Sequence, residues 1–340
     1  MSHKFQNDYS VLASPRILEA LSRYGQEENV PYGLDRHSAH AASLIKEKFG
    51  APNGSVYFLS GGTQTNLVFL SAALKPFEAV ISLGSGHINV HETGAVEGTG
   101  HKIVVVPGKE GKMYPEDIEK VMATHRDMHM VKPRLAYISN STEIGTIYTR
   151  DELRALRECC DRHGLLLFID GARLGSALTS KQNDVPPSLI GAVADGFYVG
   201  GTKNGLLFGE ALVVNNPSIA EGFAYHIKNR GAMLAKGYAV GIQFEAAFED
   251  GLYFELAEKT NRMADRLKEG LKRLGLPIMD SPTNQVFVTL PKGKAEAFIA
   301  AYGCELWEDQ GEKMTIRFVT SFATEEKDVV ELLDFASSLI

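Results

Sequence analysis

An aspartate and a lysine stand in two segments where their side chains could do chemistry. Asp170 ends the apolar run LLLFID, so we expect it at the carboxyl end of a buried strand, where open α/β sheets bind ligands. Lys203 lies within GGTKNG, and glycines on both sides of a lysine let a planar ligand approach its amine. Burial lowers the pKa of such an amine and leaves it free to form a Schiff base. Taken singly, a structural aspartate cap and an ordinary loop lysine remain open as alternatives.

The segment SGGTQTN, residues 60–66, is a candidate anion site. It follows the apolar run VYFLS and opens a helical pattern, so its free backbone N–H groups and the helix dipole would form the anion site. No Lys-Ser/Thr pair follows at the spacing of a nucleotide-binding loop, and the three-glycine dinucleotide pattern is missing. A single phosphate group therefore fits better than a nucleotide, while a glycine turn with a threonine cap is the structural alternative.

Two pairs of histidines stand four residues apart: His87 with His91, and His125 with His129. Glu92 follows the first pair and invites a metal interpretation, but the segment is not HExxH and no third ligand is evident. We therefore predict no metal site. For the second pair a solvated helix face is the better interpretation, whereas the flat ring of His87 could stack on an aromatic cofactor.

Arg317 lies inside the apolar run MTIRFVTS near the C-terminal end of the sequence. A guanidinium in such a strand is unfavourable unless it meets an anion, and its fork matches a carboxylate. The sequence predicts either a ligand carboxylate or a structural Asp or Glu as the partner.

The elements that must position these residues follow an alternating pattern. Seven short apolar runs, spread over residues 56–214, are separated by helical patterns or loops, which predicts a mostly parallel sheet covered by helices on both faces. Residues 149–152, TRDE, have the spacing of a capping box, and Gly164 can end that helix. After a helical stretch to Leu274, two strands bracket a helix. We predict an α/β protein with a large domain at 1–248 and a smaller α+β domain at 249–340.

Composition excludes several classes of protein. The 340 residues hold 35 Lys and Arg against 42 Asp and Glu, a net charge of −7 that disfavours nucleic-acid binding. No stretch approaches the length of a membrane span, and the first ten residues lack the pattern of a secretory signal. Three cysteines, two of them adjacent, give no disulfide framework and no zinc spacing. We expect a cytoplasmic protein that contacts neither nucleic acid nor membrane.

A phosphate cradle, a strand-end aspartate, a glycine-flanked lysine and a carboxylate-seeking arginine together make the parts of a pyridoxal-phosphate enzyme acting on an amino acid. The sequence resembles the threonine aldolase / β-eliminating lyase family of the aspartate-aminotransferase superfamily, fold type I, and most closely the low-specificity aldolases. The resemblance runs from about Asn7 to the C-terminus and is specific in FIDGARLGSAL and GGTKNG.

The resemblance implies a set of contacts to pyridoxal 5′-phosphate. Lys203 would hold the cofactor, and Asp170 would pair with its ring nitrogen. Arg173 would lie beside the phenolic oxygen, and His87 would stack on the ring. Gly62 and Thr63 would bind the phosphate.

The resemblance also implies substrate contacts. Arg317 matches the arginine that grips the substrate carboxylate, and Tyr32 belongs to a Tyr-Gly-x-Asp turn of the family. Asn7 stands where the family has serine, so an asparagine contact is expected. The family arginine near Leu234 is missing, and Arg230 or Lys236 could substitute for it.

The implied activity is the cleavage of L-threonine, L-allo-threonine and related β-hydroxy-α-amino acids to glycine and an aldehyde, with Lys203 and Asp170 as catalytic residues. His87 or His129 would remove the hydroxyl proton. The family further implies a homodimer or homotetramer with active sites at the subunit interface. The alternatives are a β-eliminating or other amino-acid lyase on the same scaffold, a metal hydrolase using His87, His91 and Glu92, and a non-catalytic scaffold.

Overall fold

The computed structural model describes residues 3–339. In this range the larger body is built on a seven-stranded sheet with the order β1-β7-β6-β5-β4-β2-β3. The strands are β1 (Ser55–Leu59), β2 (Glu78–Leu83), β3 (Lys102–Val106), β4 (Lys132–Ser139), β5 (Leu166–Asp170), β6 (Gly196–Gly200) and β7 (Glu210–Val214). Among these strands only β7 is antiparallel to its neighbours. The predicted α/β class and mostly parallel sheet are confirmed.

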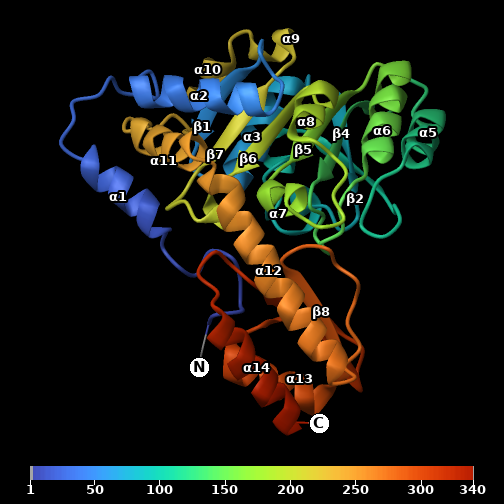
Figure 1. The fold of residues 1–340 in the computed structure, drawn as a ribbon. Helices are drawn as coiled ribbons and strands as arrows, with labels where there is room; N and C mark the ends of the chain where they lie inside the picture. The colour runs from blue at the N-terminus through green and yellow to red at the C-terminus, as the bar shows by residue number, and fades with distance from the viewer. Residues whose placement is uncertain (1–2, 340) are drawn as a thin grey trace.

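Helices cover both faces of this sheet (Figure 1). One face packs against α1 (Pro15–Arg23), α2 (Arg36–Lys48), α5 (Pro115–Thr124), α6 (Arg150–His163), α7 (Leu174–Leu178), α8 (Pro187–Val193) and α11 (Tyr238–Glu249). The other packs against α3 (Gly62–Ala73), α4 (His87–Val90), α9 (Pro217–Ala220) and α10 (Phe223–Asn229). Short 3₁₀ turns occupy Glu97–Thr99 and Thr202–Asn204.

The strands are apolar along their whole length because neighbouring residues serve opposite faces. Ile169 of β5 packs in the core beneath α6 and α8, and Phe168 packs in the core beneath α3. The capping box of α6 forms as expected, with Thr149 and Glu152 bonded to each other's backbone, and Gly164 ends the helix at a φ of +64°.

The carboxyl ends of the parallel strands meet at one edge of the sheet. Ser139 and Asp170, the last residues of β4 and β5, are register partners. Because β7 is reversed, its first residue, Glu210, pairs with the last residues of β6 and β1, which are Gly200 and Leu59. The reversed strand therefore brings an acidic side chain to the same edge as Asp170.

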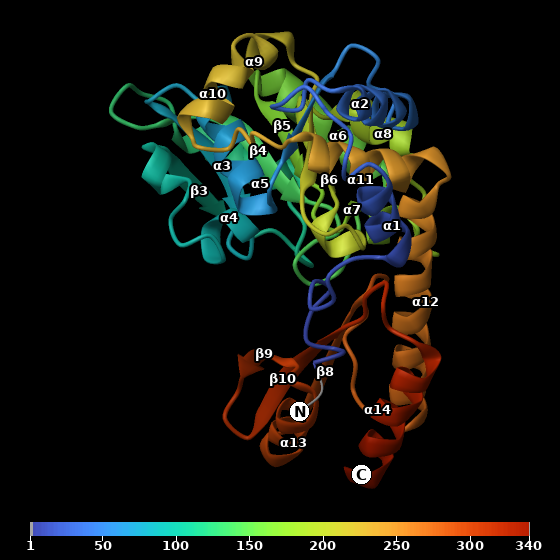
Figure 2. The same ribbon diagram turned by 90° about the vertical axis from the view of Figure 1, so that its left-hand side faces the viewer.

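The long helix α12 (Leu252–Arg273) leads from the larger body to a smaller one, seen below it in Figure 1 and from the side in Figure 2. The smaller body has a three-stranded antiparallel sheet of β8 (Gln285–Pro291), β10 (Lys313–Val319) and β9 (Glu305–Asp309), with α13 (Lys292–Tyr302) and α14 (Glu326–Leu339). Phe5 packs in its core, and Val319 donates a backbone hydrogen bond to the Phe5 carbonyl. The N-terminal segment thus reaches the smaller body, and the division at 248/249 stays a prediction.

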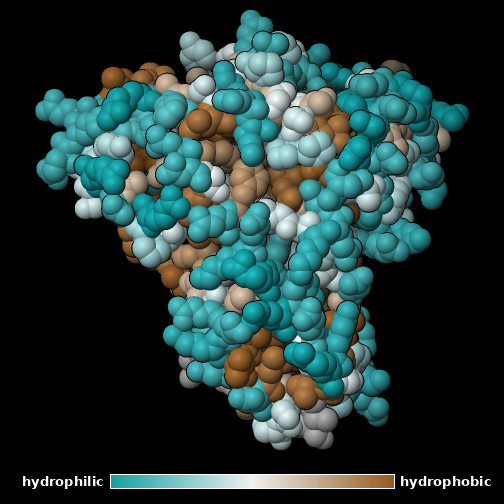
Figure 3. Space-filling view, viewed as in Figure 1, coloured by the Kyte–Doolittle hydropathy of each residue, from teal (hydrophilic) through white to brown (hydrophobic). Residues whose placement is uncertain are grey.

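The face seen in Figure 3 is mainly hydrophilic, with hydrophobic areas between the helices of the larger body and on the smaller one. Within residues 3–339 there is no helix both long enough and apolar enough to cross a membrane.

Candidate active site

A cavity of about 410 Å³ opens at the carboxyl edge of the large sheet. Its lining comes from the turn after β1, the α4 region, the ends of β5 and β6 and the start of β7, and includes Gly62, Thr63, His87, His91, Asp170, Lys203 and Glu210. Tyr9 of the N-terminal segment completes the wall. Most of the predicted cofactor-binding residues are therefore brought together.

Asp170 is the most completely bonded group of this cavity. Its Oδ2 accepts hydrogen bonds from the Tyr137 hydroxyl at 2.5 Å and from the Asn66 amide at 3.1 Å. Its Oδ1 accepts from the Tyr198 hydroxyl at 2.5 Å and from the backbone N–H of Ala172 at 3.0 Å. Four donors from four separate segments fix the orientation of this carboxylate.

The same contacts determine the charge of Asp170. Burial alone would raise the pKa of this carboxyl group, but the charge of His87 and the hydrogen bonds from Tyr137 and Tyr198 hold the pKa below its ordinary value. Asp170 is therefore ionised at neutral pH although it is buried. An ionised, oriented carboxylate is what a protonated ring nitrogen requires as a partner.

His87 is held by acidic side chains. Its Nδ1 lies 2.7 Å from Oε1 of Glu92, which is buried and also accepts a hydrogen bond from Asn66 at 2.8 Å. Its backbone N–H donates to Oε1 of Glu143 at 3.0 Å, and the Ser139 hydroxyl donates to the same oxygen at 2.6 Å. These contacts leave the ring exposed on the cavity side, in keeping with a stacking surface.

Lys203 and Glu210 both line the cavity together with the aspartate. Burial lowers the pKa of Lys203, and the charge of Arg173 acts in the same direction, against the negative charges of Asp8 and Asp170. Burial raises the pKa of Glu210 to about 7, and its Oε2 accepts the Gly201 N–H at 2.9 Å. A lowered lysine pKa makes more of the neutral amine available as a nucleophile.

The turn before α3 has the geometry of an anion site. Thr65 makes the first intrahelical hydrogen bond, back to the Gly61 carbonyl, so the N–H groups of Gly62, Thr63 and Gln64 have no hydrogen-bond acceptor among the described residues. A Cβ on Gly62 would lie 3.0 Å from the Tyr198 hydroxyl, which holds Asp170. Glycine at this position therefore leaves room for the Tyr198 hydroxyl, so the phosphate-binding turn and the hydrogen bond to Asp170 can form side by side.

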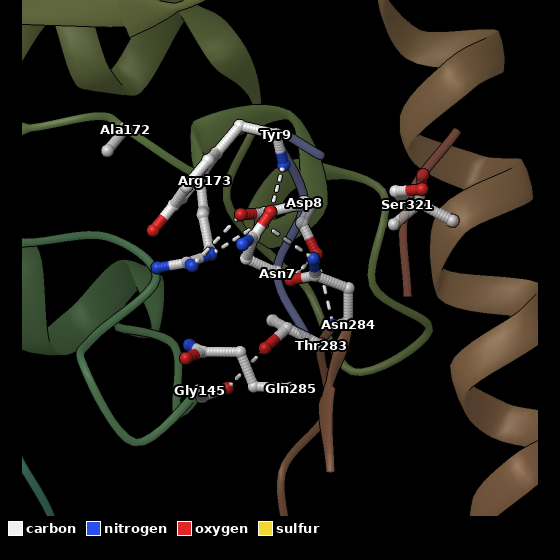
Figure 4. Close-up of polar contacts among 12 residues, drawn as sticks. Asn7, Asp8, Tyr9, Gly145, Ala172, Arg173, Thr283, Asn284, Gln285 and Ser321 are labelled. Carbon is white, nitrogen blue, oxygen red and sulfur yellow. Dashed lines mark hydrogen bonds and ion pairs between the residues drawn. The ribbon is translucent and has the colours of Figure 1, made fainter. Parts of the chain in front are cut away.

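Arg173 is paired within the protein, as Figure 4 shows. Its Nε and Nη2 donate to the two oxygens of Asp8 at 2.7 and 3.1 Å, and Asn284 donates to Asp8 at 3.0 Å. Asp8 belongs to the N-terminal segment and Asn284 to the loop before β8, so this buried cluster joins three parts of the chain. Arg173 does not line the cavity directly, but its charge lowers the pKa of Lys203 after the effect of burial.

Arg317 of β10 has an acidic partner on the neighbouring strand β9. Glu305, its register partner on β9, forms an ion pair with Nη2, and Gln285 accepts from Nη1 at 2.8 Å. The guanidinium also lies over the ring of Trp307, 5.1 Å from its centroid. Its buried Nε has no hydrogen-bond partner among the described residues, and Glu305 is half exposed. The structural alternative is thus realised in part, and the buried Nε is the guanidinium nitrogen left unpaired among the described residues.

Arg317, like Arg173, is not among the residues that line the cavity, and three further predicted residues also lie outside it. His129 is exposed in the loop three residues before β4. Asp170 pairs with the last residue of β4, so the two residues lie at opposite ends of that strand. Tyr32 is half exposed, with a φ of +66°, and lines a separate hollow. Asn7 uses its side-chain oxygen to accept from the backbone of Tyr9 at 3.0 Å, so only its amide nitrogen is available to a ligand.

Neither substitute for the missing family arginine lines the cavity. Arg230 follows α10 and has a buried Nε that lacks a hydrogen-bond partner in the described part of the chain. Lys236 precedes α11. Their roles stay predictions.

A metal site does not form from the histidines at α4. In residues 3–339 the three side chains whose ligand atoms lie close enough for one ion are Glu119, Cys159 and His163, on α5 and α6. Burial raises the pKa of Cys159 to about 11, so its thiol is protonated at neutral pH. His87, His91 and Glu92 are not such a group, which removes the geometric basis of the metal-hydrolase alternative.

The sequence analysis did not identify several side chains that contact Asp170 or line the cavity. Tyr137 and Tyr198 occupy the strand face opposite Ile138 and Val199, so the alternation of the strands places them on the α3 side. No local pattern joins them to Asp170. Glu210 carried a visible signal, since it is an acidic residue at the start of the apolar run EALVV.

The residues present fit pyridoxal 5′-phosphate. The cavity combines free helix N–H groups, a buried amine of lowered pKa and an ionised carboxylate held by four donors. Glu92 Oε2 and Asn66 Oδ1 remain buried without a hydrogen bond to any described residue, next to His87 and Asp170. The donor set matches a phosphate, an aldehyde and a protonated pyridine at separate points of one cavity.

The fold and this site define the class of pyridoxal-phosphate enzymes with the aspartate aminotransferase fold. A variant of Thermus thermophilus aspartate aminotransferase has this fold, with a TM-score of 0.76 and 18% identity over 99% of this chain and 91% of that one. The model of the beta-eliminating lyase family matches residues 9–292, and the chain belongs to this family.

Two relatives are similar over nearly their whole length. The low specificity L-threonine aldolase of a Pseudomonas species is 30% identical over 97% of this chain and 96% of its own. The structure of Leishmania major threonine aldolase is 44% identical, with a TM-score of 0.96 over 98% of both chains. The predicted family, fold type and cofactor are confirmed.

Proposed function

We propose that this protein is a pyridoxal-phosphate-dependent aldehyde-lyase that cleaves L-threonine, L-allo-threonine and related β-hydroxy-α-amino acids to glycine and an aldehyde. The observation that carries the proposal is the meeting, in one cavity, of Lys203 with an ionised Asp170 that four donors hold. The similarity to threonine aldolases along the whole chain supports the choice of substrate.

The cofactor, when bound, supplies an electron sink for the bond that breaks at the substrate α-carbon. Lys203 would hold the cofactor through its amine, and Asp170 would keep the ring nitrogen protonated. Gly62 and Thr63 would bind the phosphate with backbone N–H groups, and His87 would offer its ring as a stacking surface. All five residues line the same cavity, which supports these assignments.

We assign the substrate carboxylate to the positively charged side of the cavity. Burial and then the charge of Arg173 lower the pKa of Arg317, and Arg173 likewise lowers the pKa of Lys203. Arg173 thus lies within electrostatic range of both other cations, although Asp8 and Glu305 offset part of the charge. Arg317 would bind the carboxylate with its unpaired Nε, and Asn7 would add an amide donor.

We extend the proposal to a homodimer or homotetramer in which Tyr32 reaches the active site of a second copy. Tyr32 and Leu34 expose 49% and 76% of their area beside an apolar hollow of about 320 Å³, which Phe58 of the edge strand β1 also lines. Exposed apolar surface of this kind is typical of subunit interfaces. Light scattering should give a mass of two or four chains, and Leu34→Asp should lower it.

We place the enzyme in the cytoplasm because its cysteines, Cys159, Cys160 and Cys304, are all free thiols. Fractionation of the cell that makes the protein would test this location.

The function is tested by incubating the holoenzyme with L-threonine and identifying the products. Acetaldehyde and glycine in equal amounts are expected. Ammonia with a keto acid would instead indicate β-elimination, the reaction after which the family is named.

Borohydride reduction should attach the cofactor to the peptide that contains Lys203. Lys203→Ala should abolish both the release of acetaldehyde and glycine and the labelling of this peptide. Cofactor attached at Lys236, or at no lysine, would contradict the assignment.

A further inference from the structure

The cavity contains a second histidine that has no role in the function described so far. His91 follows α4 directly and lines the cavity together with His87, and the centroids of the two rings are 5.5 Å apart. No hydrogen bond joins the imidazole of His91 to any other side chain or backbone group in residues 3–339. Both of its ring nitrogens are therefore available to a ligand.

The other two histidines considered for proton transfer are poorly placed for it. Nδ1 of His87 is engaged with buried Glu92 at 2.7 Å, and the backbone of His87 is tied to Glu143. These contacts suit a ring that must stay in one orientation. His129 lies in an exposed loop at the other end of β4, outside the cavity.

The charged groups around His91 favour its neutral form. Burial lowers the pKa of His91, and the charges of His87, Arg317 and Lys203 act in the same direction, whereas Glu305 opposes them. The pKa therefore lies below the ordinary value of 6.5, and at neutral pH the imidazole can accept a proton. Its electrostatic neighbours Arg317 and Lys203 are the groups assigned to the substrate carboxylate and to the cofactor.

We propose that His91 is the group that accepts the β-hydroxyl proton of the substrate, an inference that rests on the proposed aldehyde-lyase function. The O–H bond breaks as a ring nitrogen of His91 takes the proton, and the oxygen electron pair forms the aldehyde carbonyl. The electrons of the broken Cα–Cβ bond remain on the α-carbon side. One proton is later returned to the α-carbon of glycine, so the proton taken from the hydroxyl is balanced and His91 is neutral again.

The test compares His91→Gln with His125→Gln, whose histidine lies outside the cavity. With L-threonine as substrate, kcat should fall about 100-fold or more in His91→Gln and stay near wild type in the control. The wild-type kcat should decline as the pH falls through the pKa of His91, because the protonated ring cannot accept a proton, and this acid limb should be missing in His91→Gln. Turnover and pH profile of His91→Gln that match wild type would overturn the proposal.

Glycine separates a chemical role from a structural one because it has no hydroxyl group. Its affinity, measured from the absorbance of the bound cofactor, should change less than about threefold in His91→Gln if His91 acts only on the hydroxyl proton. Added imidazole should restore turnover to His91→Ala, which a packing defect would not allow. Lost glycine binding together with no rescue would overturn the proposal.

A direct titration checks the same residue without turnover. The ring resonance of His91 in the wild-type holoenzyme, assigned by its absence from the His91→Gln spectrum, should titrate below 6.5. A resonance that titrates above 6.5 would contradict the proposal. If wild type releases no acetaldehyde, the proposed function fails and this inference fails with it; if wild type is active and His91→Gln equally so, the inference alone fails.

Discussion

The two sides of the cavity differ in how completely their polar groups are bonded. On the cofactor side, four donors satisfy both oxygens of Asp170; three come from α3, β4 and β6, and the fourth from the turn after β5. On the substrate side, Arg317 keeps an unpaired Nε and pairs with half-exposed Glu305, and the imidazole of His91 has no hydrogen-bond partner in the described part of the chain. The cofactor side is preorganised for one permanent ligand, whereas the substrate side keeps donors and acceptors free for groups that come and go.

The supporting elements explain this difference. Asp170 ends β5 near the middle of a sheet that is covered on both faces, where packing fixes each side chain. Arg317 lies in a three-stranded sheet whose outer strand β9 is mostly exposed. Electrostatic preorganisation needs the first environment, and substrate exchange is compatible with the second.

Removing the charge on the cofactor side should have the largest effect. Asp170→Asn should still bind the cofactor but lose turnover by about 100- to 1,000-fold, because a neutral amide no longer stabilises a protonated ring nitrogen. Tyr137→Phe, which removes one of the four donors, should lose much less. Steady-state kinetics of both variants measure this, and near wild-type turnover in Asp170→Asn would contradict the role of the carboxylate.

On the substrate side, Arg317→Lys should mainly weaken binding. A lysine cannot bind a carboxylate and also keep the contacts that the guanidinium makes to Gln285 and Glu305. Truncating one partner of a desolvated charge pair costs about 2–5 kcal/mol, roughly 30- to several thousand-fold in affinity. Glycine and threonine affinities should fall while the absorbance of the cofactor without substrate stays unchanged. Unchanged affinity would falsify the assignment, and a variant that fails to fold would show that the pair with Glu305 is structural.

His87 connects the two sides, and its replacement should have a moderate effect. If the ring serves as a stacking surface, His87→Phe should keep about tenfold more activity than His87→Ala, because an aromatic ring can replace the contact. Turnover of the two variants, with cofactor content measured by absorbance, tests this. Loss of all turnover in both with cofactor retained would instead identify His87 as an acid or base.

The smallest effect concerns the stability of the cofactor-free protein. Glu210 has an ordinary pKa of 4.5 that burial raises to about 7, so the folded state holds its proton more tightly than the unfolded state. Stability linked to this group is complete below about 4.5 and is lost as the pH rises through about 7.

Glutamine does not titrate, so the Glu210→Gln variant should not lose this stability as the pH rises. Its free energy of unfolding relative to wild type should therefore increase between pH 4.5 and about 7, by less than about 3 kcal/mol. Urea unfolding at a series of pH values measures the difference. A difference between wild type and Glu210→Gln that does not vary with pH would contradict the raised pKa.

Much of the fold could be predicted because each strand and helix carries a local pattern. Seven apolar runs became the seven strands of the large sheet, and the capping box at Thr149 and the glycine at 164 bound α6 as expected. Asp170 and Lys203 could be singled out because a strand end and flanking glycines are local features. The sequence by itself therefore determined the sheet, its helices and the chemistry of two central side chains.

Only the tertiary structure decided which side chains meet these residues. The partner of Arg173 is Asp8, 165 positions away in the chain, and the partner of Arg317 is Glu305, found on the neighbouring strand and not on its own. His91 and Glu210 reach the cavity through the turn of α4 and the reversed direction of β7. The physical reason is that strand order, direction and register bring together residues that no local pattern connects, because pairing across a sheet is independent of distance along the chain.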